Sequence, residues 1–269
     1  MHKQEFSFEK DTSYQQLCSE FYDLLRPEAS SNEVNFYSDF LKTIKGPILE
    51  AMCGSGRILI PLLEEGYQID GVDNAVHMLS NCQKRCAAKQ LNVQLFNQPL
   101  EELSLSKKYA CIFIALGSFQ HFADHRITAF QVLQRLHDHL LPEGSLLIDM
   151  IVPWGLIQAD IQENLYSHEI RTVESQKTVT SYDGAKIISK TTAKVYPDEQ
   201  LALSENYYEK VVNDKTTARE KESIAFRWYH RYEMELILEK AGFSVAHVWN
   251  ESFEPHLQST VYQAIKEKL

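Results

Sequence analysis

The sequence lacks any apolar run close to the roughly 20 residues that a membrane-spanning helix requires. Its N-terminus, MHKQEFSFEKD, is mixed in charge and has no apolar stretch typical of a secretory signal. Basic residues are scarce: 27 Lys and Arg stand against 37 Asp and Glu, a formal charge of −10 at pH 7. Because proteins that track phosphates normally carry a basic face, we expect no nucleic-acid partner, and because no apolar run has membrane length, we expect no membrane partner.

A disulfide framework is also missing. The chain has five cysteines, an odd and scattered set: Cys18, Cys53, Cys82, Cys86 and Cys111. This usage favours reduced thiols in the cytoplasm. Cys82 and Cys86 are one helical turn apart, but no further Cys or His lies at zinc-ligand spacing nearby, so we expect an ordinary helix face and no metal.

The length allows one large domain, or one domain with an insertion. The chain has 269 residues, of which 44% are hydrophobic and 24% charged, as is ordinary for a globular protein. No internal repeat or low-complexity segment interrupts it. Function must therefore be sought in local motifs.

The most informative stretch runs from Gly46 to Gly71. It begins with a short apolar run at 48–49 that ends on Glu50 and is typical of a buried parallel strand. The sequence Cys53-Gly54-Ser55-Gly56 then predicts a tight turn, where missing Cβ atoms let backbone N–H groups approach a ligand. Apolar spacing at 57–65 predicts a helix, and helix N-termini attract polar and anionic groups.

This turn does not complete a dinucleotide fingerprint. The pattern G-x-G-x-x-G would need a third glycine three residues after Gly56, where the chain has Leu59. A nicotinamide oxidoreductase is therefore disfavoured but stays open as an alternative. Glu50 at the strand end would repel a pyrophosphate, whereas it could accept from an ammonium group. A zwitterionic or cationic cofactor such as S-adenosylmethionine fits better.

A second acidic residue follows at the expected place. Residues 67–73 are predicted to form the next strand, which ends on Asp73, and a carboxylate there binds ribose hydroxyls. With the segments ILEAMCGSGR and GVDNAVHML, the chain resembles the class I S-adenosylmethionine-dependent methyltransferases. The resemblance implies that Glu50 and the turn 53–56 surround the methionine part of the cofactor and that Asp73 holds the ribose. Met52 departs from the glycine commonest at its position.

The resemblance extends to the cofactor's other contacts. Many relatives place an aspartate for the adenine amino group where this chain has Pro99, so either Asn97, Gln98 or the Leu100 backbone takes that role or the contact is weaker. The residues expected to bind the cofactor are Tyr14, Tyr22, Glu50, Met52, Cys53, Gly54, Ser55, Gly56, Arg57, Asp73, Asn74, Met78, Gln98, Pro99, Leu100, Ala115, Leu116, Gly117 and Ser118.

Catalysis is assigned to two residues. FIALGSFQHF looks like the family's fourth motif, and His121 follows this strand end, with an imidazole whose ordinary pKa suits a general base. The alternative is that His121 only hydrogen-bonds loop backbone. Tyr22, in a segment similar to the family's tyrosine-containing lid, is the second catalytic candidate, and core packing is its alternative. His137 and His139 are predicted to lie at the surface. The motifs of DNA adenine and cytosine methylases are absent.

The remaining pattern predicts an α/β fold. Helices are expected at 12–25 (capped by Thr12 or Ser13), 31–44, 76–88, 127–141 and 229–241, and core strands at 91–96, 109–116, 145–152, 243–249 and 260–265. Alternating runs within 160–228, with a turn signal at Tyr182-Asp183-Gly184, predict three or four antiparallel strands. The resemblance implies a Rossmann-like doubly wound, mostly parallel seven-stranded sheet with helices on both faces, plus this inserted antiparallel β-meander.

Four segments are predicted: a helical lid at 1–45, a cofactor-binding core at 46–159, the inserted β subdomain at 160–228, and a C-terminal helix with closing strands at 229–269. The inserted strands resemble the small β-domain of glycine and amino-sugar N-methyltransferases. This resemblance implies methyl transfer to N or O of a small molecule. The alternative is a non-catalytic protein of the same fold that binds the cofactor or serves in assembly. The inserted strands are expected to cover the active site or, alternatively, to form a homodimer contact.

Overall fold

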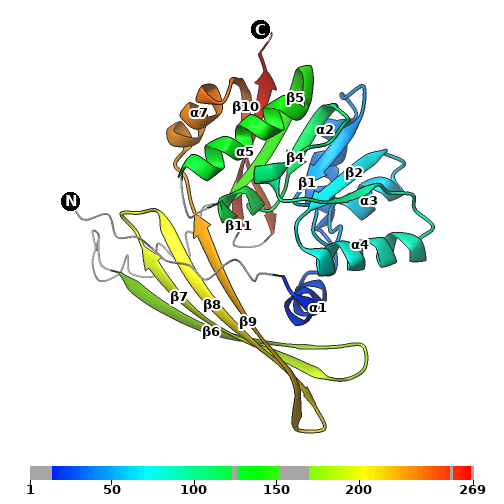
Figure 1. Cartoon of the computed structure of the whole chain (residues 1–269), viewed down its shortest axis with the longest axis vertical. Helices are drawn as coiled ribbons and strands as arrows, with labels where there is room; N and C mark the ends of the chain where they lie inside the picture. Colours follow the sequence, from blue (N-terminus) through cyan, green and yellow to red (C-terminus); the bar gives the residue numbers. More distant parts are fainter. Residues whose placement is uncertain (1–13, 123–125, 152–169, 255–256, 268–269) are drawn as a thin grey trace.

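The structure, a computed structural model, describes residues 14–122, 126–151, 170–254 and 257–267. Figure 1 shows two sheets: a larger one flanked by helices, and a separate four-stranded sheet, with helix α1 (Gln16–Leu25) lying between the two parts. No helix among these described residues is both long and apolar enough to cross a membrane.

The larger sheet has seven strands in the order β10-β11-β5-β4-β1-β2-β3. Its strands are β1 (Ile48–Ala51), β2 (Ile69–Asp73), β3 (Leu95–Asn97), β4 (Tyr109–Ile114), β5 (Leu140–Ile151), β10 (Phe243–Glu254) and β11 (Leu257–Lys266). The first five run parallel, whereas β11 is antiparallel to both of its neighbours, β5 and β10. The predicted mostly parallel seven-stranded sheet is thereby confirmed.

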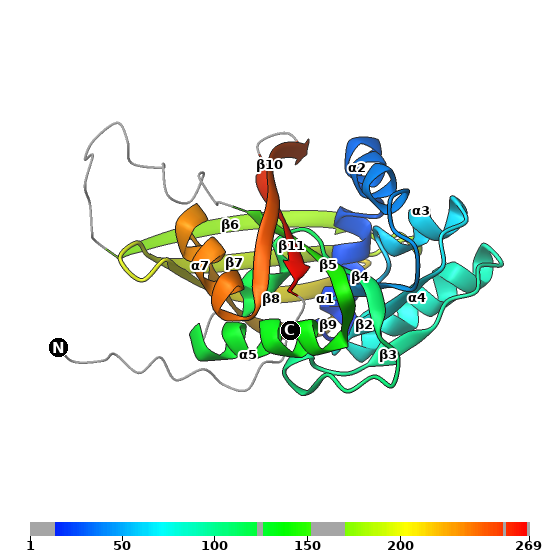
Figure 2. The same ribbon diagram turned by 90° about the horizontal axis from the view of Figure 1, so that it is seen from above.

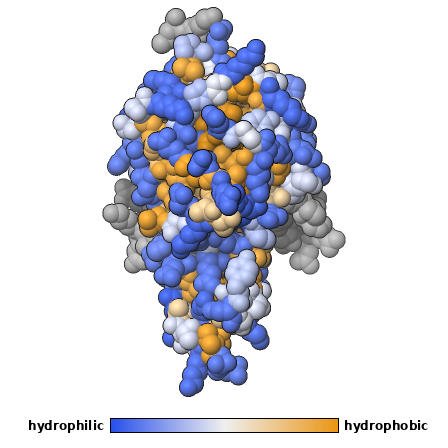
Figure 3. Space-filling model, turned by 90° about the vertical axis from the view of Figure 1, so that its right-hand side faces the viewer, coloured by the Kyte–Doolittle hydropathy of each residue, from blue (hydrophilic) through white to orange (hydrophobic). Residues whose placement is uncertain are grey.

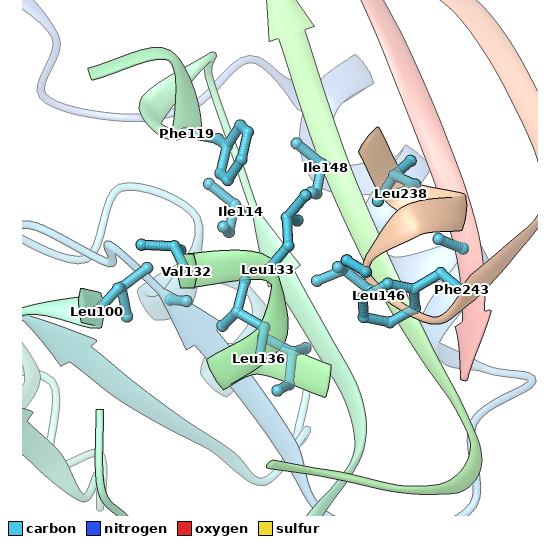
Figure 4. Close-up of a cluster of buried hydrophobic side chains, with 14 of the residues drawn as sticks. Leu100, Ile114, Phe119, Val132, Leu133, Leu136, Leu146, Ile148, Leu238 and Phe243 are labelled. Carbon is cyan, nitrogen blue, oxygen red and sulfur yellow. The ribbon is translucent and has the colours of Figure 1, made fainter. Parts of the chain in front are cut away.

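Helices cover both faces of this sheet (Figure 2). On one face α2 (Ser31–Leu41), α3 (Leu59–Glu64) and α4 (Val76–Ala88) contribute to one hydrophobic cluster, and on the other face α5 (Arg126–His139) and α7 (Arg231–Lys240) contribute to a second. Figure 4 shows Val132, Leu133 and Leu136 of α5 directed at the side chains of the central strands. Burying each such aliphatic side chain stabilises the folded state by about 1.5–3 kcal/mol, so these two layers of helices hold the sheet together.

The inserted sheet is an antiparallel meander of β6 (Arg171–Thr180), β7 (Lys186–Tyr196), β8 (Leu201–Val212) and β9 (Lys215–Arg227). The predicted hairpin turn is present: Ser181 N–H donates to Ala185 O at 2.8 Å, and Gly184 has a φ of 80° that favours glycine. The inserted sheet packs against α1, with Tyr208 of β8 in the same hydrophobic cluster as Leu17 and Phe21 of the helix. In Figure 3 the lower lobe, formed by this sheet, is mostly hydrophilic, while apolar residues gather on the lobe above it.

Several predicted boundaries were wrong. α1 begins at Gln16 with Gln15 as its N-cap, and the predicted caps Thr12 and Ser13 lie outside the described residues. The strand predicted at 91–96 is only Leu95–Asn97, because β3 is the sheet edge and pairs only where β2 reaches it. The helix predicted at 127–141 ends at His139, and β5 continues from Leu140 through the Pro-Glu-Gly segment instead of starting at 145. His139 was also wrongly predicted at the surface: it is buried, and its Nε2 accepts from the Leu105 N–H at 3.0 Å.

Candidate functional site

The site lies where the parallel strands β1, β2 and β4 end. Because the carboxyl ends of parallel strands meet at one edge of a sheet, ligands bind in open α/β folds at this edge. Glu50 sits near the end of β1, Asp73 ends β2, and the loop 115–118 follows β4. The structure therefore brings together the three segments that the sequence predicted to share a site.

Gly54 and Gly56 of the glycine turn are required for different structural reasons. Gly54 has a φ of 52° and Gly56 a φ of 83°. A Cβ on Gly56 would meet the Cys82 Sγ at 2.7 Å, whereas a Cβ on Gly54 would meet nothing within 4 Å. Gly56 therefore allows close packing of the turn on α4, and Gly54 leaves open space beside the backbone. Met52 has a φ of 59°, a backbone conformation that explains why glycine is commonest there.

Asp73 ties the turn to the end of β2. Its Oδ2 accepts from the Gly54 N–H at 2.8 Å and its Oδ1 accepts from the Ala75 N–H at 2.8 Å. Burial raises the pKa of Asp73, and these backbone N–H donors oppose that rise. The side chain is half-buried, so part of it remains open to a ligand beside Gly54.

Glu50 is a buried carboxylate with spare accepting capacity. It is 3% exposed, and its Oε2 has no hydrogen-bond partner among the described residues. Burial raises its pKa well above the usual range, and the Arg57 guanidinium counteracts this. A buried carboxylate oxygen of this kind is costly unless a donor or a cation meets it.

Arg57, predicted to bind the cofactor, has its guanidinium in a buried bidentate pair with Glu33 of α2, at 2.7 and 2.6 Å. Sequence reasoning missed Glu33. One signal was available: Ser30 and Glu33 have the spacing of a capping box, and Ser30 Oγ accepts from the Glu33 N–H at 3.2 Å. That pattern predicts a helix start but not that the Glu33 side chain turns inward.

Tyr22 lies on α1 and Tyr14 just precedes it, within electrostatic reach of Arg57 and Asp73, respectively. Their rings meet edge to face at a centroid distance of 6.0 Å. Burial raises the pKa of both phenols; the Asp73 charge adds to the rise at Tyr14, whereas the Arg57 charge opposes it at Tyr22. Both phenols are therefore neutral at pH 7 and keep their hydroxyl protons.

Asn97, which ends β3, and Gln98, which follows it, each have one side-chain atom bound within the chain. Asn97 Nδ2 donates to the carbonyls of Asp73 and Asn74 at 3.1 and 3.0 Å. Gln98 Oε1 accepts from the Ser104 N–H at 2.9 Å. Pro99 precedes the short helix η1 (Leu100–Glu102).

The loop after β4 is held by Asp149, which sequence reasoning also missed. Leu116 and Gly117 have φ values of 54° and 65°, a strained arrangement for the leucine. Asp149 Oδ2 accepts from the Leu116 N–H at 3.0 Å, and its backbone carbonyl accepts from the Gly117 N–H at 3.2 Å. Burial raises the pKa of Asp149 to about 7. Asp149 lies within the predicted strand, and the strand pattern gave no sign of a buried carboxylate.

His121 faces the inserted sheet. It ends the short helix η2 (Ser118–His121), its Nδ1 lies 3.3 Å from the Ala225 carbonyl of β9, and its ring lies 5.8 Å from that of Phe226. The imidazole therefore stands between the core edge and β9. The predicted cofactor residues Cys53, Ser55, Met78, Leu100 and Ala115 are buried around the turn and loops.

Within the described residues, no three His, Cys, Asp or Glu side chains are grouped so that they could hold a metal ion. The five cysteines are free and buried. Cys82 and Cys86 lie in the hydrophobic cluster under α4.

Comparison with known proteins shows which domain and fold this chain resembles. Residues 48–144 match the methyltransferase domain family. The Bacillus subtilis (strain 168) protein YqeM, named as a candidate methyltransferase, is 29% identical over 131 residues, which are 48% of this chain and 52% of that protein. A similarly named protein of Geobacillus sp. (strain WCH70) is 29% identical over 103 residues, 38% of this chain and 41% of its own length. The chain thus spans about half the length of these curated relatives or less.

Solved structures resemble the whole chain. The sugar N-methyltransferase KedS8 from Streptoalloteichus sp. ATCC 53650 has a TM-score of 0.72 at 13% identity, covering 100% of this chain and 99% of that one. An S-adenosylmethionine-dependent methyltransferase from Clostridium acetobutylicum ATCC 824 has a TM-score of 0.71 at 15% identity, covering 92% and 97%. Residues 48–144 thus match a methyltransferase domain, and the solved structures confirm the predicted Rossmann-like fold.

Proposed function

We propose that this protein is an S-adenosylmethionine-dependent methyltransferase that moves a methyl group to nitrogen or oxygen of a small molecule. The observation that carries the proposal is Glu50, a buried carboxylate with an unpartnered Oε2 below a glycine turn with open space at Gly54. A cofactor with an ammonium and a sulfonium group would supply the positive charge that this carboxylate needs.

The other cofactor contacts follow from the same edge. Asp73 is proposed to accept from the ribose hydroxyls, with its hydrogen bond to Gly54 fixing the carboxylate beside the turn. Asn97 Nδ2 and Gln98 Oε1 are bound within the chain, so we assign the Leu100 backbone N–H as donor to a ring nitrogen of the adenine and Asn97 Oδ1 as acceptor from its amino group. Tyr14 and Tyr22 would cover the cofactor from α1.

Methyl transfer from a sulfonium is an in-line displacement, so the protein mainly positions its partners and excludes water. An acceptor that must lose a proton also needs a base. If the Nδ1 of His121 donates to the Ala225 carbonyl, the lone pair lies on Nε2, where it could take that proton. Tyr22, a neutral phenol, is proposed to orient the reacting groups as a hydrogen-bond donor.

Calorimetric titration with S-adenosylmethionine and with S-adenosylhomocysteine tests the cofactor assignment. Binding by the wild-type protein and at least tenfold weaker binding by Glu50→Gln are expected, because the substitution keeps the shape and removes the charge. Asp39→Asn, on the exposed side of α2, is the matched control. No binding by the wild-type protein would refute the assignment.

A radiolabelled methyl-transfer screen over amines, amino sugars and phenols tests the activity. The solved relatives include a sugar N-methyltransferase, which supports including amino sugars. Incorporation into a small molecule is expected. Cofactor binding without transfer to any acceptor would favour the non-catalytic alternative, and incorporation into bulk RNA or protein would overturn the small-molecule assignment.

The five free cysteines support a cytoplasmic location, and light scattering would test a homodimer through the inserted strands.

A further inference from the structure

Helix α1 is capped by a different part of the chain. Its own N-cap, Gln15, makes no side-chain cap hydrogen bond. Instead Glu220 of β9 accepts from the backbone N–H groups of Leu17 and Cys18 at 2.8 and 3.0 Å. A carboxylate at this end satisfies N–H groups that lack partners within the helix and complements the helix dipole.

Glu222, two residues further along β9, holds Tyr14, which lies two positions before the first residue of the helix. Its Oε1 accepts from the Tyr14 N–H at 2.8 Å and from the Cys18 thiol at 3.1 Å. Its Oε2 accepts from Asn206 Nδ2 and from the Tyr208 hydroxyl, both at 3.0 Å. Glu222 is 1% exposed, so these donors offset the cost of burying its charge.

The Tyr14 backbone is strained, and this capping network maintains it. Its φ is 56°, which is rare for a bulky residue and costs about 1–3 kcal/mol. Two hydrogen bonds hold it there: the Tyr14 N–H donates to Glu222, and the Ser19 hydroxyl donates to the Tyr14 carbonyl at 2.9 Å. The conformation places the ring against Tyr22 and near the Asp73 charge.

Further contacts join α1 to both parts of the molecule. Lys210 of β8 donates to Glu20 at 2.8 Å, and the Ser181 hydroxyl donates to the same carboxylate at 2.6 Å. From the core, Asn81 of α4 donates to Asp23 at 2.8 Å. In Figure 1, α1 accordingly lies between the inserted sheet and α4.

We propose that Glu220 and Glu222 are positioning residues through which the inserted sheet fixes Tyr14 and Tyr22 over the cofactor, so that this sheet sets cofactor affinity. The proposal rests on the proposed function. If α1 frays at its N-terminus, only a fraction of the molecules hold the tyrosines in the position that binds the cofactor. The apparent dissociation constant for the cofactor rises in inverse proportion to that fraction.

The test compares Glu220→Ala with the double variant Gln15→Asp/Glu220→Ala. We expect Glu220→Ala to weaken binding of S-adenosylhomocysteine and to raise the KM for the cofactor by roughly three- to thirtyfold, with kcat at saturating cofactor nearly unchanged. An aspartate at the N-cap accepts from the second and third helical N–H groups, which here are those of Leu17 and Cys18. Gln15→Asp should therefore restore affinity to within about threefold of wild type.

Glu205→Ala is the matched control, because Glu205 is an exposed carboxylate of the same sheet that pairs with Lys221. Glu222→Gln should act like Glu220→Ala, and its melting temperature shows whether it folds. Hydrogen exchange at the Leu17 and Cys18 amides should quicken in Glu220→Ala and slow again in the double variant. A wild-type protein that binds no cofactor refutes the proposed function. Cofactor binding that Glu220→Ala leaves unchanged, or a loss that Gln15→Asp does not restore, refutes the positioning role.

Discussion

Glu33 of α2 and Arg57 of the glycine turn form a buried bidentate ion pair, with N–O distances of 2.6 and 2.7 Å. The pair joins the helix that precedes the sheet to the turn that follows its first strand. Because Arg57 is paired with Glu33, its charge is already balanced. Glu50 Oε2 and Asp149 Oδ1 are buried at the same end of the strands and accept no hydrogen bond from the described residues. We infer that a cationic ligand is favoured there.

Removing one member of this pair should destabilise the fold. Glu33→Gln leaves a buried guanidinium without its counter-charge, and we expect a loss of about 3 kcal/mol or more in the free energy of unfolding by urea. Replacing both members, as in Glu33→Gln/Arg57→Met, should recover much of that loss. Asp39→Asn breaks an exposed pair with Lys42 on the same helix and should change nothing measurable. Equal stability of Glu33→Gln and wild type would show that the pair contributes little.

Alanine should affect mainly stability at Gly56 and mainly cofactor binding at Gly54. Both substitutions carry the backbone cost of a positive φ, about 1 kcal/mol. In Gly56→Ala the new methyl group also meets the Cys82 Sγ at 2.7 Å, so this variant should unfold at clearly lower urea concentration. In Gly54→Ala the methyl group enters open space, so stability should fall only slightly while cofactor binding falls at least tenfold. Similar loss of stability in both variants would contradict this distinction.

Asp149 should make stability depend on pH. Burial raises its folded-state pKa to about 7 from the ordinary 3.8, so the folded protein holds this proton more tightly than the unfolded chain. The resulting stability is present below pH 4 and is lost as the pH rises to 7, by up to about 4 kcal/mol. Asp149→Asn cannot ionise, so its stability relative to wild type should increase between pH 5 and pH 8 in urea titrations. A constant difference between the two proteins across this range would rule out the effect.

His121 should report through the pH dependence of turnover. If it is the base, His121→Gln should lower kcat by roughly 10²- to 10⁴-fold and remove the acidic limb of the pH–rate profile. His137→Gln is a control, since His137 packs against Phe243 away from the edge. Full turnover by His121→Gln would show that His121 is not the base.

The edge strands and helix ends were predicted less well than the central strands. The run at 109–116 indicated β4, because a strand buried on both faces must be apolar throughout its length. The edge strand β3 lacks that requirement, and its length depends on where β2 offers partners. Likewise Cys82 was correctly placed on a helix, but its contact with Gly56 depends on how α4 crosses the turn.

The sequence by itself determined the class of fold and which segments form the candidate site, because the spacing of Glu50, the glycines and Asp73 is local and follows the strand–turn–helix order. Only the tertiary structure revealed the partners: Glu33 for Arg57, Asp149 for the Leu116 loop, and Glu220 and Glu222 for α1. These contacts join residues far apart in the chain, and each depends on which side chain the packing turns inward. A buried carboxylate has no sequence period of its own, so its partner becomes visible only when the elements are brought together.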